Sequence, residues 1–316
     1  SLIRVNLLIL TVGYLFHQII KNSKKMKHKI LVTGASGAFG SLACIQLVEN
    51  GHQVVGTMRS ISGKNETIAN ELKSKGVALV EIDVTNEASV NAGVQSAIEL
   101  MDGLDTVFNN AGIGANGILE CFTSNDIQKM FDVNVFGVQR LMRAVLPHLR
   151  QQGKGTIIHT SSCIGRVTTP FLASYSASKY ALESLADGYR AELSGFGIES
   201  CIVEPGGFPT GFMGGMITPS DTERITQYGE MASLPETALN GYVAYVESIP
   251  EQRPERVAEA VVGLVNTPFG EKPFRTVVDF SGLKEGIENY NKVLNETTKA
   301  IYTANGVANL LTLNKD

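Results

Sequence analysis

The chain has 316 residues, of which 43% are hydrophobic and 18% are charged, and its formal net charge is −4. This composition supplies a large apolar core and excludes a disordered, collagen-like or low-complexity protein. The longest basic cluster is the short run 21–29, which together with the net negative charge argues against nucleic acid as a partner.

Residues 1–26 differ from the rest of the chain. The stretch 5–20 is mostly apolar and is followed by lysines, as in a membrane anchor. It is shorter than the about 20 residues that a span needs, and no small-residue cleavage site follows it. A membrane is therefore an unlikely partner. Three interpretations stay open: a short anchor or interfacial helix, a segment packed on the body or a partner, or an extension upstream of a biological start at Met26.

From Lys29 onward, short β-branched segments alternate with segments of helical spacing, which indicates βαβ units and a parallel sheet covered on both faces. We predict a single doubly wound α/β domain of the Rossmann type over 27–280, with strand order 3-2-1-4-5-6-7, and a C-terminal extension over 281–316. The predicted strands cover 29–33, 53–58, 77–82, 104–108, 155–160, 199–203 and 274–280. The predicted helices cover 38–50, 64–75, 87–101, 126–151 and 174–196.

Ligands of open parallel sheets bind beyond the carboxyl ends of the strands. Six of the predicted strands end in chemically distinctive residues, and we expect these to line one crevice. They are Gly34, Ser36, Gly37, Phe39 and Gly40 after the first strand, Arg59 after the second, Asp83 and Val84 after the third, Asn110, Ala111 and Gly112 after the fourth, Ser162 after the fifth, and Pro205, Gly206 and Thr210 after the sixth.

The first three of these strand ends indicate a dinucleotide site. In TGASGAFG (33–40) the glycines let the backbone approach a pyrophosphate, and the following helix offers free N–H groups. Arg59 stands where an NAD-specific fold places an acid, and it suits a 2′-phosphate unless it is an ordinary surface arginine. Asp83 is a candidate for the adenine amino group or for the cap of a helix beginning near Asn86.

Two further features indicate chemistry. Tyr175 and Lys179 lie four residues apart, on one face of a helix. A phenol with a pKa of about 10 becomes a useful acid or base near neutrality if a positive charge stabilises its phenolate, and Lys179 can supply that charge. Asn134 falls within the apolar stripe of 126–151, so its amide needs a polar partner such as backbone or a relay water.

Together, NNAG (109–112), Asn134, Ser162 thirteen residues before Tyr175, YSASK (175–179) and PGGFPT (205–210) resemble the short-chain dehydrogenase/reductase family over about 27–280. The resemblance implies that Tyr175 gives or takes the proton and that Ser162 polarises the carbonyl. It further implies that Lys179 binds the nicotinamide ribose and lowers the tyrosine pKa, and that Asn134 holds a relay water.

The same resemblance implies the cofactor and the reaction. The basic residue at position 59 is similar to the NADP(H)-preferring pattern, and Pro205 to Gly207 and Thr210 would flank the nicotinamide. We therefore expect hydride transfer that interconverts a carbonyl and a secondary alcohol on a small-molecule substrate. The family also implies a cytoplasmic homodimer or homotetramer built on the helices 126–151 and 174–196.

The resemblance further implies that a lid over about 207–253 covers the substrate. This lid carries a set of aromatic residues, methionines and one isoleucine that favours a bulky apolar ligand: Phe208, Phe212, Met213, Met216, Ile217, Tyr228, Met231, Tyr242 and Tyr245. The five histidines show no metal-ligand spacing and the four cysteines form no C-x-x-C pair, so we expect no metal and reduced, buried thiols.

One departure keeps other interpretations open. The usual TGxxxGxG of the shorter branch would need glycine at position 38, where Ala38 stands, and Gly37 gives the spacing of the epimerase-type branch. A non-catalytic dinucleotide-binding sensor or scaffold of the same fold is a further alternative. The presence of Asn134, Ser162, Tyr175 and Lys179 favours an enzyme.

Residues 1–25 contain none of these motifs, so we expect them to be dispensable for the chemistry. A protein that begins at Met26 should fold and retain the activity of the full chain, as measured by circular dichroism and turnover. A truncated chain that fails to fold would instead support a packed segment, and recovery of the full chain in the membrane fraction would support an anchor.

Overall fold

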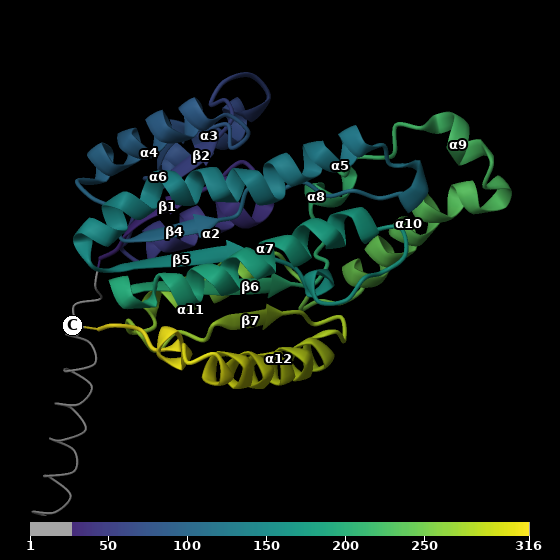
Figure 1. The fold of residues 1–316 in the computed structure, drawn as a ribbon. Coiled ribbons are helices and arrows are strands. Elements are labelled where there is room, and N and C mark those ends of the chain that lie inside the picture. The colour runs from purple at the N-terminus through teal and green to yellow at the C-terminus, as the bar shows by residue number, and fades with distance from the viewer. Residues whose placement is uncertain (1–26, 316) are drawn as a thin grey trace, which may run out of the picture.

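The computed structural model describes residues 27–315, so the expectations for residues 1–26 lie outside it. The described chain contains a seven-stranded parallel sheet in the order β3-β2-β1-β4-β5-β6-β7, which confirms the predicted topology (Figure 1). The strands are β1 (Lys29–Val32), β2 (Gln53–Met58), β3 (Ala78–Glu81), β4 (Thr106–Asn109), β5 (Gly155–Thr160), β6 (Ile198–Pro205) and β7 (Arg275–Val278).

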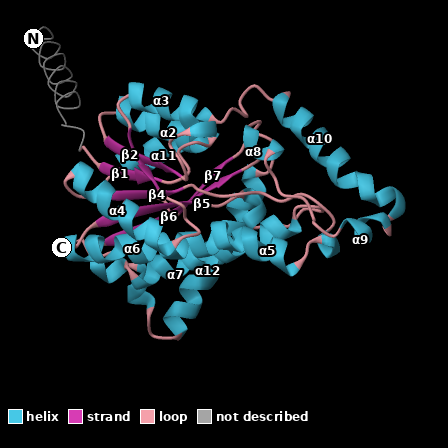
Figure 2. Cartoon of the chain, turned by 90° about the horizontal axis from the view of Figure 1, so that it is seen from above, coloured by secondary structure: helices cyan, strands magenta, loops and turns pink. Residues whose placement is uncertain are grey.

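Helices cover both faces of the sheet, so that two apolar cores form (Figure 2). One face is covered by α2 (Ala38–Glu49), α3 (Glu66–Ser74) and α11 (Glu255–Asn266), and the other by α4 (Glu87–Met101), α6 (Gly137–Gln152) and α7 (Ala173–Glu192). The central strands β4, β5 and β6 are buried along their whole length. The polar residues in these strands are therefore buried as well, among them Asn109, His159 and Glu204.

The predicted helix over 126–151 is interrupted in the structure. A capping box between Thr123 and Asp126 starts α5 (Ser124–Phe131), and a π-helical turn, η3 (Asp132–Phe136), separates it from α6. π-turns insert one residue into a helix without breaking it and are frequent at functional sites. The predicted helix over 126–151 is therefore present, and the π-turn that contains Asn134 is the feature that the apolar spacing did not predict.

The lid leaves the body after β6 and contains α8 (Gly211–Gly214), α9 (Thr222–Thr226), η6 (Gly229–Ser233) and α10 (Leu234–Glu247). In Figure 1 these helices extend past the carboxyl ends of the strands. A parallel bridge between Ala115 and Ile217 connects the lid to the segment after β4. Ser220 then donates through its N–H and its hydroxyl to Asp126, so the base of the lid is attached to the first turn of α5.

The C-terminal segment packs on the domain. Helix α12 (Lys284–Ala304) lies along β7, and Ile287 is buried with Cys163 and Val277. The 3-10 turn η7 (Ala308–Leu311) follows it and contacts α7. No helix within residues 27–315 is long and apolar enough to cross a membrane.

Candidate active site

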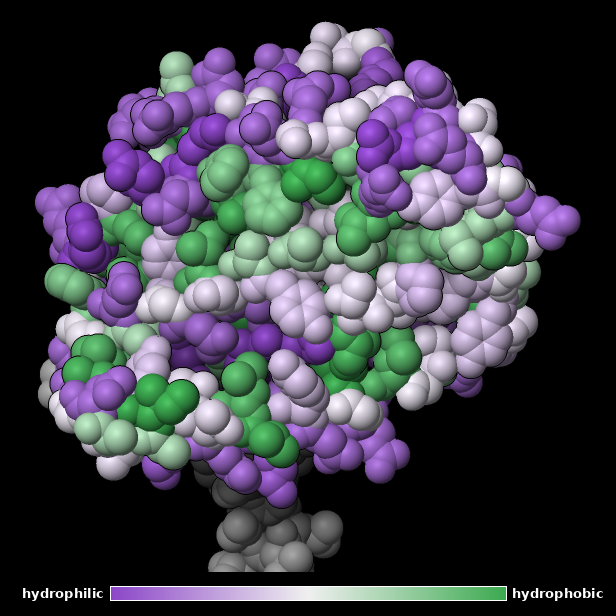
Figure 3. Space-filling model, turned by 45° about the vertical axis from the view of Figure 1, so that its right-hand side comes forward, coloured by the Kyte–Doolittle hydropathy of each residue, from purple (hydrophilic) through white to green (hydrophobic). Residues whose placement is uncertain are grey.

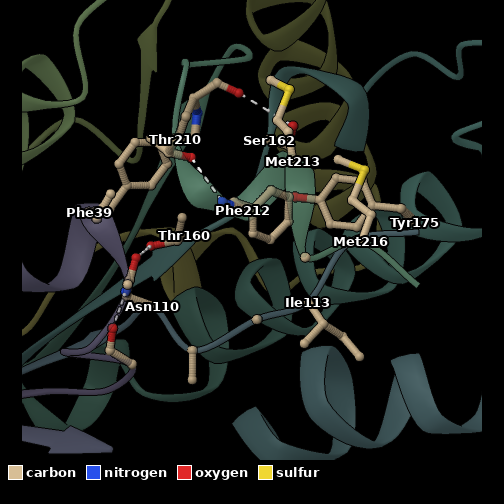
Figure 4. A pocket seen from close by; sticks show the side chains of 18 of the residues that line it. Phe39, Asn110, Ile113, Thr160, Ser162, Tyr175, Thr210, Phe212, Met213 and Met216 are labelled. Carbon is tan, nitrogen blue, oxygen red and sulfur yellow. Dashed lines mark hydrogen bonds between the residues drawn. The ribbon is translucent and has the colours of Figure 1, made fainter. Parts of the chain in front are cut away.

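The loop after β4 is fixed to β1 by Thr33. Its hydroxyl accepts hydrogen bonds from the N–H groups of Asn110 and Ala111, and its carbonyl accepts from the Asn110 amide at 3.1 Å. Asn110 also accepts from Thr160 at the end of β5 (Figure 4). One side chain therefore joins three neighbouring strand ends, which explains why an asparagine follows β4.

A cleft of about 1040 Å³ opens along these strand ends and continues beneath the lid. Figure 3 shows the face at this end of the molecule, where apolar side chains gather across the middle. Most of the residues predicted for the site line the cleft: Gly34, Ser36, Gly37, Phe39, Arg59, Asp83, Val84, Asn110, Ala111, Gly112, Ser162, Tyr175, Lys179, Pro205, Gly206 and Thr210. Gly40 and Asn134 are buried beside it and do not line it.

The glycine-rich turn fits a pyrophosphate. Gly37 is the N-cap of α2 and supplies no side-chain cap, so the first N–H groups of the helix are left for a ligand. Gly34 has a φ of +68° and lies so close to the next loop that a Cβ would be 2.9 Å from Ala111 Cα. A Cβ on Gly40 would be 2.3 Å from the Gly34 carbonyl, so Gly40 is needed for packing of the turn.

Arg59 and Asp83 lie at the end of the cleft formed by β2 and β3. Arg59 is exposed and lines the cleft with Lys64. The Asp83 carboxylate accepts from the backbone and hydroxyl of Thr85, and these hydrogen bonds, with a smaller contribution from Arg59, lower its pKa. Asn86 caps α4 through the N–H of Ser89. The capping role considered for Asp83 therefore belongs to Asn86, and Asp83 is ionised at the edge of the cleft.

Three polar side chains meet where β5 ends and α7 begins. Ser162 follows β5, and its hydroxyl donates to the Pro205 carbonyl at 3.3 Å. The Lys179 ammonium donates to the Thr160 carbonyl at 2.8 Å and lies 5.7 Å from the centre of the Tyr175 ring. All three side chains are more than nine-tenths buried, so the sequence spacing corresponds to one compact group in the cleft wall.

Burial dominates the electrostatics of this group. It raises the pKa of Tyr175 well above its usual range, and a hydrogen bond with Ser162 opposes the shift only in part. Burial also lowers the pKa of Lys179 to about 8, against an opposing effect of Glu183. The lowering of the tyrosine pKa by Lys179, which the family resemblance implies, stays a prediction, and burial is the larger effect on this phenol. At neutral pH Tyr175 carries its proton, and Lys179 is charged but close to its titration range.

Asn134 has backbone partners. Its Oδ1 accepts from the Ile113 N–H at 2.9 Å, and its Nδ2 donates to the Ile113 carbonyl at 2.9 Å and to the Ser178 hydroxyl at 3.0 Å. The backbone partner considered from the sequence is therefore confirmed, and the relay water that the family resemblance implies stays a prediction. A Cβ on Gly112 would lie 3.3 Å from Asn134 and 3.6 Å from the Lys179 nitrogen, so a side chain there would be in tight contact with the Asn134 amide.

The remaining part of the cleft is mostly apolar. Phe212 tilts against Tyr175, with 5.8 Å between ring centres, and Met213 and Met216 lie beside them (Figure 4). Phe208 and Tyr242 also line the cleft, whereas four other predicted lid residues do not: Ile217, Tyr228, Met231 and Tyr245. Tyr228 instead bonds to Glu120, and Met231 and Tyr245 are exposed.

Several lining residues were not predicted from the sequence. They come from the loop after β4, the segment before α7, helix α10 and the start of α12: Ile113, Gly114, Asn116, Ile164, Thr169, Pro170, Phe171, Leu172, Ala238, Leu239 and Leu283. Phe171 has a φ of +67°, rare for a residue with a large side chain. For Ile164 and the residues 169–172, the available sequence signal was their position between Ser162 and Tyr175.

Within residues 27–315 no group of three or more histidine, cysteine or acidic side chains is placed to hold a metal. The four cysteines are buried and unpaired, as expected. The polar groups that the cleft wall does offer include those of Ser162, Tyr175 and Lys179.

Comparisons with known proteins agree with this geometry. Residues 28–219 match the family described as short chain dehydrogenase. The chain is 34% identical to a 3-ketodihydrosphingosine reductase from Bacteroides thetaiotaomicron over 251 residues, 77% of this chain and 86% of that protein. It is 30% identical to human retinol dehydrogenase 8 over 250 residues, 75% of this chain and 78% of that protein.

A solved short-chain dehydrogenase from Streptomyces avermitilis superposes with a TM-score of 0.70 at 26% identity, covering 89% of this chain and 98% of that chain. The matched region includes the glycine-rich turn, Asn134, Ser162 and the Tyr175–Lys179 pair. The chain belongs to the short-chain dehydrogenase/reductase family, whose members are oxidoreductases that act on carbonyl and alcohol groups with a nicotinamide dinucleotide.

Proposed function

We propose that this protein is an NADP(H)-dependent oxidoreductase that interconverts a carbonyl and a secondary alcohol on a bulky apolar substrate. The observation that carries the proposal is the cleft itself. It places Ser162, Tyr175 and Lys179 together in a buried wall, next to an uncapped glycine-rich turn and beneath an apolar lid.

The glycine-rich turn, Asp83, Asn110 and Lys179 would hold the dinucleotide, and Pro205, Gly206 and Thr210 would lie beside its nicotinamide. The bound cofactor supplies or accepts the hydride. Ser162 donates a hydrogen bond to the substrate oxygen and orients it toward Tyr175. Tyr175 donates its phenolic proton to that oxygen in the reductive direction and takes a proton back in the oxidative direction.

The protonated state of Tyr175 fits its role as the acid in carbonyl reduction. A buried phenol with a raised pKa carries its proton at neutral pH, which is the form that a carbonyl reduction consumes. The charged Lys179 nearby would stabilise the phenolate that remains after proton transfer. Lys179 then has two roles, as a hydrogen-bond donor to the cofactor ribose and as the counter-charge for Tyr175.

Two cations support NADP(H) rather than NAD(H). Arg59 immediately follows β2 and lines the cleft, and Lys64 lines it from the same loop. A guanidinium can pair with a 2′-phosphate through two hydrogen bonds. Met58, the last residue of β2, offers no carboxylate for a ribose 2′-hydroxyl.

The lid supports a bulky apolar substrate. Phe212, Met213, Met216 and Leu239 line the cleft around Tyr175, and the cleft wall there contains no lysine or arginine other than Lys179 among the described residues. Two of the relatives are named for a long-chain ketone and for retinol, which are ligands of this kind. The shared character is an apolar body with one reacting oxygen.

An assembly is part of the proposal. The exposed aromatic side chains Phe136 and Tyr180 lie on η3 and α7, and we propose a homodimer or homotetramer in which these helices pair. The alternative of a non-catalytic dinucleotide-binding sensor is disfavoured because such a protein has no need for a buried tyrosine beside a buried lysine.

Replacement of Arg59 tests the cofactor. Arg59→Ala should weaken NADPH binding roughly tenfold or more and NADH binding much less, because hydrogen bonds to charged groups contribute about 1.5–3 kcal/mol. Dissociation constants from fluorescence titration would measure the effect. Arg150→Ala, at the opposite end of the sheet, is the control. Equal losses for both cofactors, or tighter NADH binding by the unmodified protein, would reject the assignment.

Removal of the Tyr175 hydroxyl tests whether this residue is the proton donor. Tyr175→Phe should reduce turnover of a ketone by about 100-fold or more and leave NADPH binding nearly unchanged, because the phenol acts in the transition state. Tyr180→Phe, on the exposed side of the same helix, should behave as the unmodified protein. A Tyr175→Phe protein that kept more than about a tenth of the rate would place the proton donor elsewhere.

A substrate panel tests the ligand class. Ketones and alcohols of steroid, retinoid or long-chain size should have a higher kcat/KM than short sugars and keto acids, because each well-buried apolar group adds about 1–3 kcal/mol of discrimination. Leu239→Ala should reduce this preference without changing the rate on a small ketone. A preference of the unmodified protein for small charged substrates contradicts the assignment.

A further inference from the structure

A buried cluster of charged side chains lies behind the candidate active site and has no part in the chemistry described so far. We call it the Arg166 network. It consists of Arg166, Glu183, Glu204 and Arg275. All four side chains are at most 6% exposed, which is rare for charged groups unless they are paired.

The contacts of the Arg166 network are short and specific. Arg166 Nη2 lies 2.5 Å from Glu183 Oε2, and Arg166 Nε lies 3.0 Å from Glu204 Oε1. Arg275 Nε donates to Glu183 Oε2 at 3.0 Å, and its Nη2 donates to Asp187 at 2.7 Å. Each arginine therefore bridges two carboxylates, which fixes both the positions and the orientations of the side chains.

Three members of the network, Arg166, Glu183 and Glu204, are close in sequence to residues of the site. Arg166 follows Ser162 by four residues and comes directly after the turn η4 (Cys163–Gly165). Glu183 lies one helical turn after Lys179 on α7. Glu204 immediately precedes Pro205, whose carbonyl accepts the Ser162 hydroxyl. The network thus connects the strand end, the serine turn and the lysine helix from the side opposite the cleft.

Helix α12 closes the network from outside. Asn291 Nδ2 donates to Glu204 Oε2, the oxygen that the arginines leave free. The Tyr290 ring lies 5.8 Å from the Arg166 guanidinium carbon. The segment predicted as a C-terminal extension therefore supplies one polar partner and one aromatic contact to a cluster that adjoins the site.

A stabilising role alone does not explain this arrangement. Buried ion pairs are often no more stabilising than apolar residues of the same size, because desolvation of the charges offsets their attraction. What such pairs do provide is directional geometry, since a bridged guanidinium permits only one placement of its partners. The main contribution of the Arg166 network is therefore the placement of Ser162 and Lys179.

We infer that Arg166, Glu183 and Glu204 act as positioning residues that fix Ser162 and Lys179 relative to one another. Helix α12 completes this network through Asn291. The inference rests on the proposed function, in which Ser162 and Lys179 act on substrate and cofactor. It assigns the C-terminal helix to the catalytic unit.

The network also acts on Lys179 through charge. The groups that bear on the Lys179 ammonium are Glu183 on its own helix, the Tyr175 phenol and His159 on β5. Burial, with the charge of Lys179, lowers the pKa of His159 to about 3, so that the imidazole is neutral. Glu183 is the carboxylate that raises the pKa of Lys179, and its Oε1 has no hydrogen-bond partner among the described residues.

Direct titration of Lys179 tests this electrostatic link without any turnover. In protein labelled with ¹³Cε-lysine, the NMR signal that disappears in Lys179→Arg reports the Lys179 pKa. Glu183→Gln should lower that pKa by about half a pH unit or more, because it removes the opposing carboxylate. Asp187→Asn also replaces a carboxylate by an amide, one turn further along α7, and should leave the Lys179 pKa unchanged. An unchanged Lys179 pKa in Glu183→Gln, or an equal change of this pKa in Asp187→Asn, would overturn the electrostatic link between Glu183 and Lys179.

Turnover tests the positioning role. Glu204→Gln and Asn291→Ala should each lower kcat by about tenfold and change the KM of the carbonyl substrate little, because misplacement of reacting groups affects the transition state first. Asn295→Ala, one turn further along α12, is the matched control and should have normal kcat. Asn291 is half-buried, so its alanine variant remains informative if Glu204→Gln does not fold.

The outcomes separate the two claims. Normal kcat in Asn291→Ala would remove α12 from the catalytic unit, and a rise in KM with unchanged kcat would replace positioning by simple binding. If the unmodified protein reduces no carbonyl while the Lys179 pKa shifts as expected, the proposed function fails and the link between Glu183 and Lys179 stands.

Discussion

The hydrogen bonds of Asn134 hold the two halves of the cleft together. Its amide pairs with both backbone groups of Ile113, as a neighbouring strand would, and reaches the Ser178 hydroxyl on α7. The loop after β4, the π-turn and the helix that carries Tyr175 and Lys179 are thereby connected by one side chain. An apolar residue at this position would leave the Ile113 groups without partners, and unpaired buried backbone groups are costly.

The sequence predicted the sheet and its order because both depend on features with a range of a few residues, namely strand composition, glycine-rich turns and helical spacing. The π-turn was not predictable in this way, since one inserted residue barely changes the apolar spacing of a helix. Asn134 was nevertheless recognisable as a polar residue in an apolar stripe. The same reasoning applied to Glu204, a carboxylate in a fully buried strand, would have predicted a cationic partner.

The contacts of the lid could not be predicted, because they depend on which side chains meet across loops distant in sequence. Phe212 and Met216 lie where a Cβ on Gly114 would be 2.8 to 2.9 Å from their side chains, while Met231 is exposed and Tyr245 donates to the Ser281 carbonyl. The composition of 207–253 indicated an apolar lid, and the lid side chains that line the cleft are mostly apolar. The division of the lid into lining and exposed residues required the structure.

The cleft combines a rigid wall with a weakly attached cover, and this difference has a functional consequence. Helix α7, which carries Tyr175 and Lys179, buries nine residues and contacts the Arg166 network, whereas α10 buries only Pro235 and Val246. Because local opening requires little free energy where few apolar contacts are lost, the lid opens far more readily than the wall. Residues of the lid can therefore change to suit another apolar substrate while the placement of Ser162, Tyr175 and Lys179 is retained.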